Sequence, residues 1–187
     1  MFSTQVRSKQ LYYFIKSIKE DFEKIKPFVE KFSSEFIMGL ADSEGGSCVS
    51  GINRGYLFLK VDIANSANLP LLEYAQELLL RKFKLDTTLR KTKTIGMQDS
   101  IIDGRLITRA KDVYCLTIKT EKQAIEYCSL IGFSLSRKNQ KVSDFVFLAT
   151  KFSKSIACIH WVKLYHKIGR YWKRKNNSPI EEFEFIN

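Results

Sequence analysis

The most informative stretch of the sequence is IMGLADSEG, at residues 37–45. Gly39 and Ser43 stand four residues apart, so in a helix they share one face. Because neither has a bulky side chain, a second helix could approach that face closely. Asp42 and Glu44 fall in the last turn, where the negative end of the helix dipole disfavours carboxylates. Stability alone would favour Lys or Arg there, so these acids are either ordinary solvated residues or ligands for a cation.

Composition favours a folded domain. The chain has 187 residues, of which 44% are hydrophobic and 13% aromatic, enough for a core of its own. Its apolar runs are too short to cross a bilayer, and the N-terminal residues lack the apolar segment of a secretory signal. The four cysteines are widely separated and form no CxxC pair, which indicates reduced thiols rather than a zinc site. We therefore expect a cytoplasmic protein of a prokaryotic host or an organellar one, neither secreted nor bound to a membrane.

The net charge is +11, from 31 Lys and Arg against 20 Asp and Glu. Such a balance favours polyanionic partners, of which nucleic acid is the commonest. The alternative is a generally basic protein without such a partner, so the distribution of the charge decides between the two.

The spacing of apolar residues predicts the order helix-hairpin-helix-hairpin-helix. The expected helices cover 8–31, 33–43, 71–83 and 121–131, with more helix over 142–172 broken near Lys154; the expected strands cover 47–52, 56–63, 86–92 and 113–120. This order predicts an α/β (α+β) fold, in which helices cover one face of an antiparallel, saddle-like sheet. We expect an N-terminal helical extension over 1–32, a core over 33–150, a basic C-terminal helix over 151–176 and an acidic tail over 177–187 that is a candidate for disorder.

Cationic and aromatic side chains gather in several places. Alternation in the second strand places Tyr56, Phe58 and Lys60 on the face opposite its apolar residues, which suits a binding surface. A predicted hairpin with a turn at Asp103–Gly104 carries Arg90, Lys91, Lys93, Arg105, Arg109 and Lys111. A basic β-ribbon of this kind fits the DNA major groove, although an exposed loop is the alternative.

Two more basic segments follow. One includes Arg137 and Lys141. The other is the expected final helix, with an apolar stripe that includes Trp161 and Trp172; we interpret it as an amphipathic core helix rather than a DNA contact. Several phosphate contacts together would make binding strongly dependent on salt.

The residues around 37–45 resemble the signature of the LAGLIDADG homing endonucleases. The order of later segments strengthens the resemblance, namely VDIAN at 61–65 and IGFS at 131–134 followed by Arg137 and Lys138. The resemblance covers about residues 33–150. It implies that two signature helices pack together, here through Met38, Gly39, Leu40 and Ser43. Because the chain has one such motif, we expect a homodimer.

The resemblance also implies the residues of the active site. Glu44, with Gly45, would hold Mg²⁺ or Mn²⁺ at the scissile phosphate, and Asp42 would be structural. Asn65 would lie near the nucleophilic water, or be a turn residue. Lys138 would lie near the scissile phosphate as a catalytic group, or be an ordinary phosphate-contacting or solvated lysine.

The function implied is a sequence-specific, divalent-metal-dependent endonuclease that cleaves double-stranded DNA, of the intron or intein homing type. The alternative on the same scaffold is an RNA maturase that binds intron RNA, or a DNA-binding protein that does not cleave. A third possibility, apart from the resemblance, is a basic α/β protein that binds RNA.

Overall fold

The central feature is a four-stranded antiparallel sheet with the order β1-β2-β6-β3. The computed structural model describes residues 9, 13, 22–102, 105–169 and 171–175. The four strands are β1 (Gly46–Ser50), β2 (Phe58–Ser66), β6 (Val113–Ile118) and β3 (Thr87–Lys93). The predicted mixed α/β class with an antiparallel sheet is confirmed.

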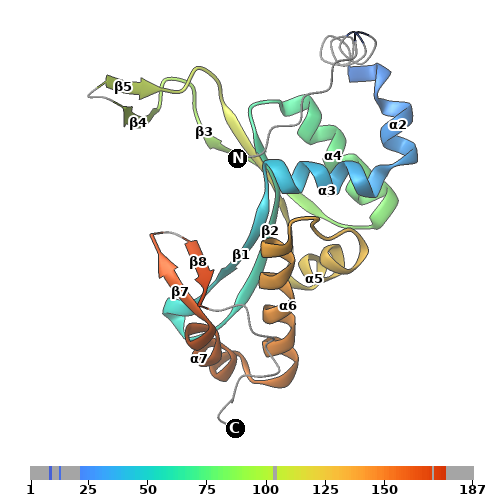
Figure 1. Ribbon diagram of the computed structural model, residues 1–187. Helices are drawn as coiled ribbons and strands as arrows, with labels where there is room; N and C mark the ends of the chain where they lie inside the picture. Colours follow the sequence, from blue (N-terminus) through green and yellow to red (C-terminus); the bar gives the residue numbers. More distant parts are fainter. Residues whose placement is uncertain (1–8, 10–12, 14–21, 103–104, 170, 176–187) are drawn as a thin grey trace.

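Helices cover one face of this sheet (Figure 1). They are α3 (Ser33–Ser43), α4 (Leu69–Phe83), α5 (Glu121–Leu130) and α6 (Ser136–Lys151). A short helix α2 (Lys26–Lys31) precedes α3, and α7 (Lys154–Leu164) follows α6. Asn68 caps α4 by accepting from the N–H of Leu71, and Thr120 caps α5 by accepting from the N–H of Gln123. No described helix is both long enough and apolar enough to cross a membrane.

The core lies between the sheet and these helices. Leu59, Val61 and Ile63 of β2 are fully buried, and Leu57 just before the strand is 2% exposed. Phe58 and Lys60, which alternate with them, are only half-buried. This alternation was predicted and is confirmed. The strand itself begins two residues later than expected and extends to Ser66.

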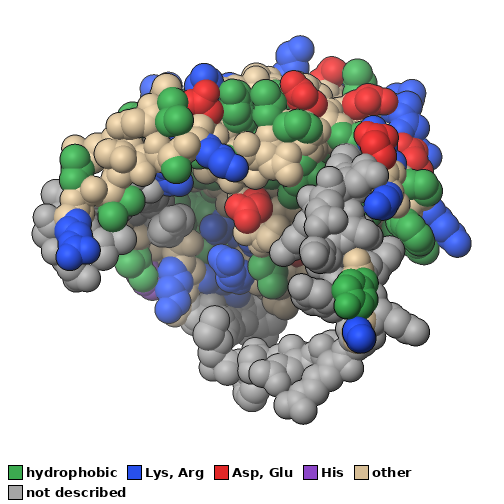
Figure 2. Space-filling model, turned by 90° about the horizontal axis from the view of Figure 1, so that it is seen from above, with side chains coloured by type: hydrophobic (Ala, Val, Ile, Leu, Met, Phe, Trp, Pro, Cys, Tyr) green, Lys and Arg blue, Asp and Glu red, His purple; other side chains and the backbone are tan. Residues whose placement is uncertain are grey.

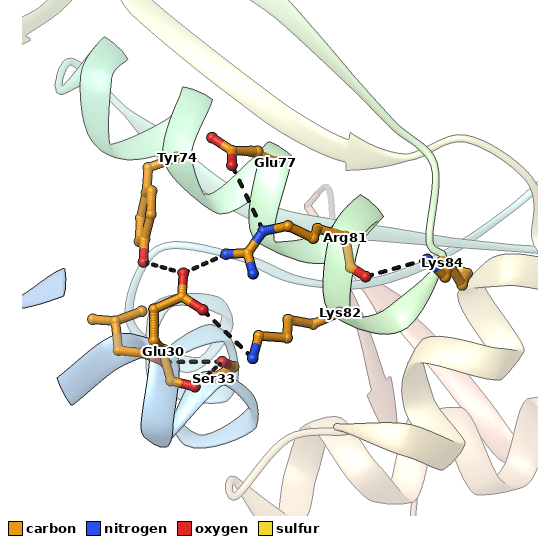
Figure 3. A network of polar contacts seen from close by, with 8 residues as sticks. Glu30, Ser33, Tyr74, Glu77, Arg81, Lys82 and Lys84 are labelled. Atoms are coloured by element: carbon orange, nitrogen blue, oxygen red, sulfur yellow. Dashed lines mark hydrogen bonds and ion pairs between the residues drawn. The ribbon is translucent and has the colours of Figure 1, made fainter. Parts of the chain in front are cut away.

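A polar network fixes α2 against α4 (Figure 3). Glu30 accepts a hydrogen bond from Tyr74 at 3.1 Å and pairs with Arg81 and Lys82. The hydrogen bond from Arg81 holds the pKa of Glu30 below its usual value. Exposed ion pairs of this kind are weak, so the network sets the direction of α2 more than it stabilises the fold. It leaves Phe28 exposed on the outside of the molecule.

A two-stranded ribbon projects beyond β3 and β6 (Figure 1). It consists of β4 (Gln98–Ile102) and β5 (Arg105–Thr108), which pair in antiparallel register. Gly96, with φ of +79°, donates to the carbonyl of Arg109 at 2.8 Å where the ribbon leaves the sheet. The predicted long hairpin is therefore present, and its expected turn at 103–104 lies outside the described residues.

The C-terminal segment differs from its prediction. The expected helical material ends at Leu164 and is followed by a hairpin of β7 (Tyr165–Ile168) and β8 (Tyr171–Arg174). Gly169 makes the turn with φ of +58°, a left-handed conformation that favours glycine. The basic helix predicted over 151–176 is thus wrong beyond residue 164. Most of the helix expected over 8–31 and the tail over 177–187 lie outside the described residues.

Candidate functional site

The carboxyl end of α3 presents Glu44 to solvent. Glu44 is exposed and caps the helix, its backbone N–H donating to the carbonyl of Leu40 at 3.0 Å. Gly45 then passes so close to β2 that a Cβ atom there would lie 2.2 Å from the carbonyl oxygen of Asp62 and 2.3 Å from that of Ile63. Only glycine fits this approach. The acid is therefore held in place by a neighbour that packs directly on the sheet.

A buried lysine caps the same helix end. The Nζ of Lys138 donates to the carbonyl oxygens of Ala41, Asp42 and Gly45 at 2.8, 2.9 and 3.0 Å. Its side chain comes from α6, and the residue is only 7% exposed. Burial lowers the pKa of Lys138, while the charge of Asp42 acts in the opposite direction. A cation at this position offsets the helix dipole, which explains how two acids are tolerated here.

These contacts change the roles of Lys138 and Gly45, which the resemblance placed in the active site. The amine of Lys138 is enclosed by three carbonyl oxygens and does not present its charge to a ligand in this conformation. The carbonyl of Gly45 accepts from that amine, and a metal ion beside an ammonium group would be repelled. We therefore interpret Lys138 and Gly45 as groups that position Glu44.

Asp42 joins α3 to the loop before α6. Its Oδ2 accepts from the N–H of Ser134 at 2.8 Å and also from the Ser134 hydroxyl. Burial alone would raise the pKa of Asp42, but the hydrogen bonds from Ser134 and Leu135 and the charge of Lys138 outweigh it and lower that pKa. The contacts give Asp42 a structural role and leave Glu44 as the acid open to solvent.

The sheet face opposite the helices is polar and partly cationic. Phe58 and Lys60 lie on it, as predicted, and both are half-buried. Lys60 pairs with Asp62 at 2.9 Å, and Asp62 also accepts from the hydroxyl of Thr117 at 2.6 Å. Tyr56 precedes β2 instead of lying within it, and it lines a hollow beside the C-terminal hairpin.

Asn65 lies on this open face at the same end of the sheet as Glu44. A β-bulge between Asp62 and Ala64 shifts the register of β2, so that Ala64 is buried and Asn65 is exposed. The strand here extends past the start of β1. The side chain of Asn65 accepts from the hydroxyl of Thr92 at 3.4 Å. Its predicted place near a water molecule stays a prediction.

The ribbon and its base carry the first basic cluster. It contains Arg90, Lys91, Lys93, Arg105, Arg109 and Lys111. Lys91 pairs with Asp112 at 2.5 Å, and Asp112 also accepts from the N–H of Ile95 at 2.8 Å. This pair shapes the base of the ribbon, whereas Arg105 and Lys111 are exposed. In the view of Figure 2 the molecule is hollowed near its middle, and Lys and Arg side chains gather there.

The outward face of α3 has an apolar side chain just before its first residue and only small residues near its end. Phe32 is 48% exposed, and Gly39 and Ser43 are exposed further along. A Cβ atom at Gly39 would meet no described atom within 4 Å, although glycine within a helix costs about 1 kcal/mol relative to alanine. Packing among the described residues does not explain this glycine. Met38 and Leu40, predicted with it for an interface, are half-buried.

The second basic cluster lies at the start of α6 and faces the C-terminal hairpin. Arg137 is exposed, and burial lowers the pKa of the half-buried Lys141. A hollow lies between the start of α6 and the hairpin, and Trp172 and Lys173 line it together with Arg137 and Lys141. Trp172 and Lys173 were not predicted as site residues, because their segment was expected to be helical. Gly169, between Tyr165 and the pair of Tyr171 and Trp172, was a local signal for a turn.

Comparisons with known proteins place the chain beside one relative without a known role. It is 28% identical, over 138 residues, to the uncharacterized protein MJ0398 of Methanocaldococcus jannaschii. The match covers 74% of this chain and 45% of that protein, so the chain spans about half the length of the relative. No family description matches the chain, and no solved structure is significantly similar to it.

Proposed function

We propose that this protein is a divalent-metal-dependent endonuclease that cleaves double-stranded DNA, of the LAGLIDADG homing type that residues 37–45 resemble. The observation that carries the proposal is the end of α3. There Glu44 is exposed, Gly45 is packed on the sheet, and Lys138 neutralises the helix end behind the acid. A folded protein gains little from such a carboxylate unless it binds something.

The chemistry of the donor set fits a hard cation shared between subunits. Mg²⁺ and Mn²⁺ prefer carboxylate, phosphate and water oxygens, and Glu44 offers one exposed carboxylate. The described residues include no group of three or more His, Cys, Asp or Glu side chains that could hold a metal alone. Glu44 of each of two copies, with DNA phosphates and water, would supply the ligands. The bound ion would activate water and stabilise the charge that develops on the phosphate.

The second copy would pack on the outward face of α3. Gly39 and Ser43 leave room for a close approach between helices, and the exposed Phe32 would add apolar area. In a two-fold dimer the same face meets itself, so the two Glu44 side chains would lie near the axis. The open sheet faces, saddle-like in the proposed dimer, and the basic ribbons would then follow the DNA on either side.

Replacing the acid tests the catalytic part of the proposal. Glu44→Gln should abolish Mg²⁺-dependent cleavage of a randomised duplex library and leave duplex binding within about twofold, because the substitution removes only a charge that holds metal. The matched control is Glu73→Gln, an exposed acid on α4 and away from the proposed contact face, which should cleave normally. Cleavage retained by Glu44→Gln would refute the metal role.

A bulky substitution tests the dimer. Gly39→Leu should shift the protein from dimer to monomer in sedimentation velocity, since the added side chain stands on the proposed contact face. Ser129→Leu, an exposed position on α5, is the control and should stay dimeric. A dimer that persists in Gly39→Leu places the interface elsewhere.

The second candidate is an RNA maturase or a non-cleaving DNA-binding protein on the same scaffold. It is favoured by the six cations of the ribbon and its base, which serve binding whether or not cleavage occurs. Tighter binding to structured intron RNA than to duplex DNA, without cleavage, would decide for it.

A further inference from the structure

The C-terminal hairpin is anchored to α6 by a buried acid. Asp144 is fully buried and accepts from the Tyr165 hydroxyl at 2.7 Å, from Arg174 Nε at 2.7 Å and from Gln140 at 2.8 Å. The ring of Tyr165 stacks on Trp161 with centroids 4.0 Å apart. Breaking a buried ion pair is costly, so the hairpin has a fixed position beside α6.

Two hollows flank this hairpin and share Trp172. One, of about 670 Å³, lies between the first turns of α6 and the hairpin; the other, of about 460 Å³, lies between the hairpin and residues 48–56. Both volumes fall in the range of small-ligand sites, about 300–1,000 Å³. Trp172 is half-buried and lines both, so its ring stands between them.

The linings of the hollows are cationic. Arg137, Lys141 and Lys173 line the larger hollow, and Arg54 and Lys167 line the smaller. No Asp or Glu is among the described residues that line either one. The larger hollow also receives the N-terminus of α6, a 16-residue helix whose first turn contains no acidic residue. Helix N-termini favour anions, so dipole and side chains act in the same direction.

Cations alternating with aromatic rings are the composition of surfaces that bind single-stranded nucleic acids. Such surfaces combine a positive groove for the phosphates with rings on which unpaired bases stack. Trp172 supplies a ring between the two hollows, and Tyr56 supplies another in the smaller one. We propose that the two hollows form a track for a single nucleic acid strand, with phosphates at the cations and an unpaired base stacked on Trp172.

A single strand fits better than a duplex because the bases of a duplex are stacked on one another and closed to Trp172. The track would bind a strand whether or not the protein cleaves DNA, so it is independent of the proposed function. DNA and RNA share the chemistry used here, and the experiment separates them.

Tryptophan fluorescence gives a direct test because the chain has two tryptophans. Trp161 is fully buried, whereas Trp172 lies between the hollows. A 12-nucleotide oligothymidylate or oligouridylate should quench the emission of the full-length protein, and the stronger of the two identifies the preferred strand. Trp172→Phe should bind either oligonucleotide with nearly unchanged affinity but lose the quenching. Quenching that persists in Trp172→Phe, or equal quenching by a blunt duplex, would overturn the proposal.

Affinity measurements by fluorescence anisotropy complete the test. Trp172→Ala should weaken strand binding roughly 5- to 150-fold, the effect of losing about 1–3 kcal/mol of stacking. Arg137→Gln and Lys173→Gln should each reduce the slope of log affinity against log salt by about 0.7. Lys122→Gln, an exposed lysine on α5, is the control and should leave both quantities unchanged. If Trp172→Ala does not fold, Trp172→Phe and the two charge variants still test whether the hollows bind a strand. Unchanged salt slopes in both charge variants would refute the proposed track.

Discussion

Replacing Gly45 by alanine tests how Glu44 is positioned. The new Cβ atom would lie 2.2 Å from the carbonyl oxygen of Asp62, and this distance must grow to about 3.4 Å for ordinary contact. The obstructing atoms belong to the backbone of β2, which is paired on both sides and cannot rotate away like a side chain. Overpacking costs about 1–3 kcal/mol, and a rigid obstacle puts Gly45→Ala near 3 kcal/mol. At roughly 2–4 °C per kcal/mol, the Tm should fall by roughly 6–12 °C.

The assay is thermal unfolding followed by circular dichroism, with Gly46→Ala as the matched control. The control adds the same methyl group one residue later, where a Cβ atom would meet no described atom within 4 Å. Its unfolding free energy should therefore change by no more than about 0.5 kcal/mol. Equal Tm shifts in the two variants would refute the argument that Gly45 is required by its contact with β2.

Two further predictions concern the contacts behind the acid. Lys138→Met keeps most of the side chain but removes the donor to three carbonyl oxygens. Urea unfolding should therefore show that the free energy of unfolding falls by about 2–3 kcal/mol. In the control Arg137→Met it should change by no more than about 0.5 kcal/mol. A smaller loss in Lys138→Met than in its neighbour would contradict the capping role. Asp42 has a lowered pKa in the folded protein, so its ionised form stabilises the fold above the unfolded value of about 3.9, and this contribution disappears as the pH falls through the lower folded value. The stability difference between wild type and Asp42→Asn should thus be present at pH 7 and shrink below about pH 4; a difference independent of pH would exclude this linkage.

Much of the fold could be predicted from local patterns. The alternation around Leu59 and the helical spacing over 69–83 are strong because each element buries one face against the core. The hairpin at the C-terminus has a weaker local signal, because a glycine such as Gly169 can end a helix as well as form a turn. Tyr165 and Trp172 continue the helical spacing of Trp161 in α7. The contact that fixes the hairpin, Tyr165 with Asp144, joins residues distant in sequence.

The candidate site was predictable only in part, for the same reason. The exposed position of Glu44 follows from its place at the end of a helix. The role of Lys138 does not, because its amine reaches carbonyls more than ninety residues earlier in the chain. The bulge that turns Asn65 outward likewise depends on the pairing of β2 with β6, which local sequence does not specify.

The buried Asp144 also determines when α6 can finish packing during synthesis. Its carboxylate belongs to α6, but its guanidinium partner, Arg174, is made about thirty residues later. Synthesis proceeds at about 5–20 residues per second, so Arg174 is added seconds after Asp144. During that time the carboxylate of Asp144 lacks its guanidinium partner and is costly to bury. A nascent chain stalled before Arg174 would keep α6 partly open to solvent, so the hairpin of β7 and β8 completes the packing of α6.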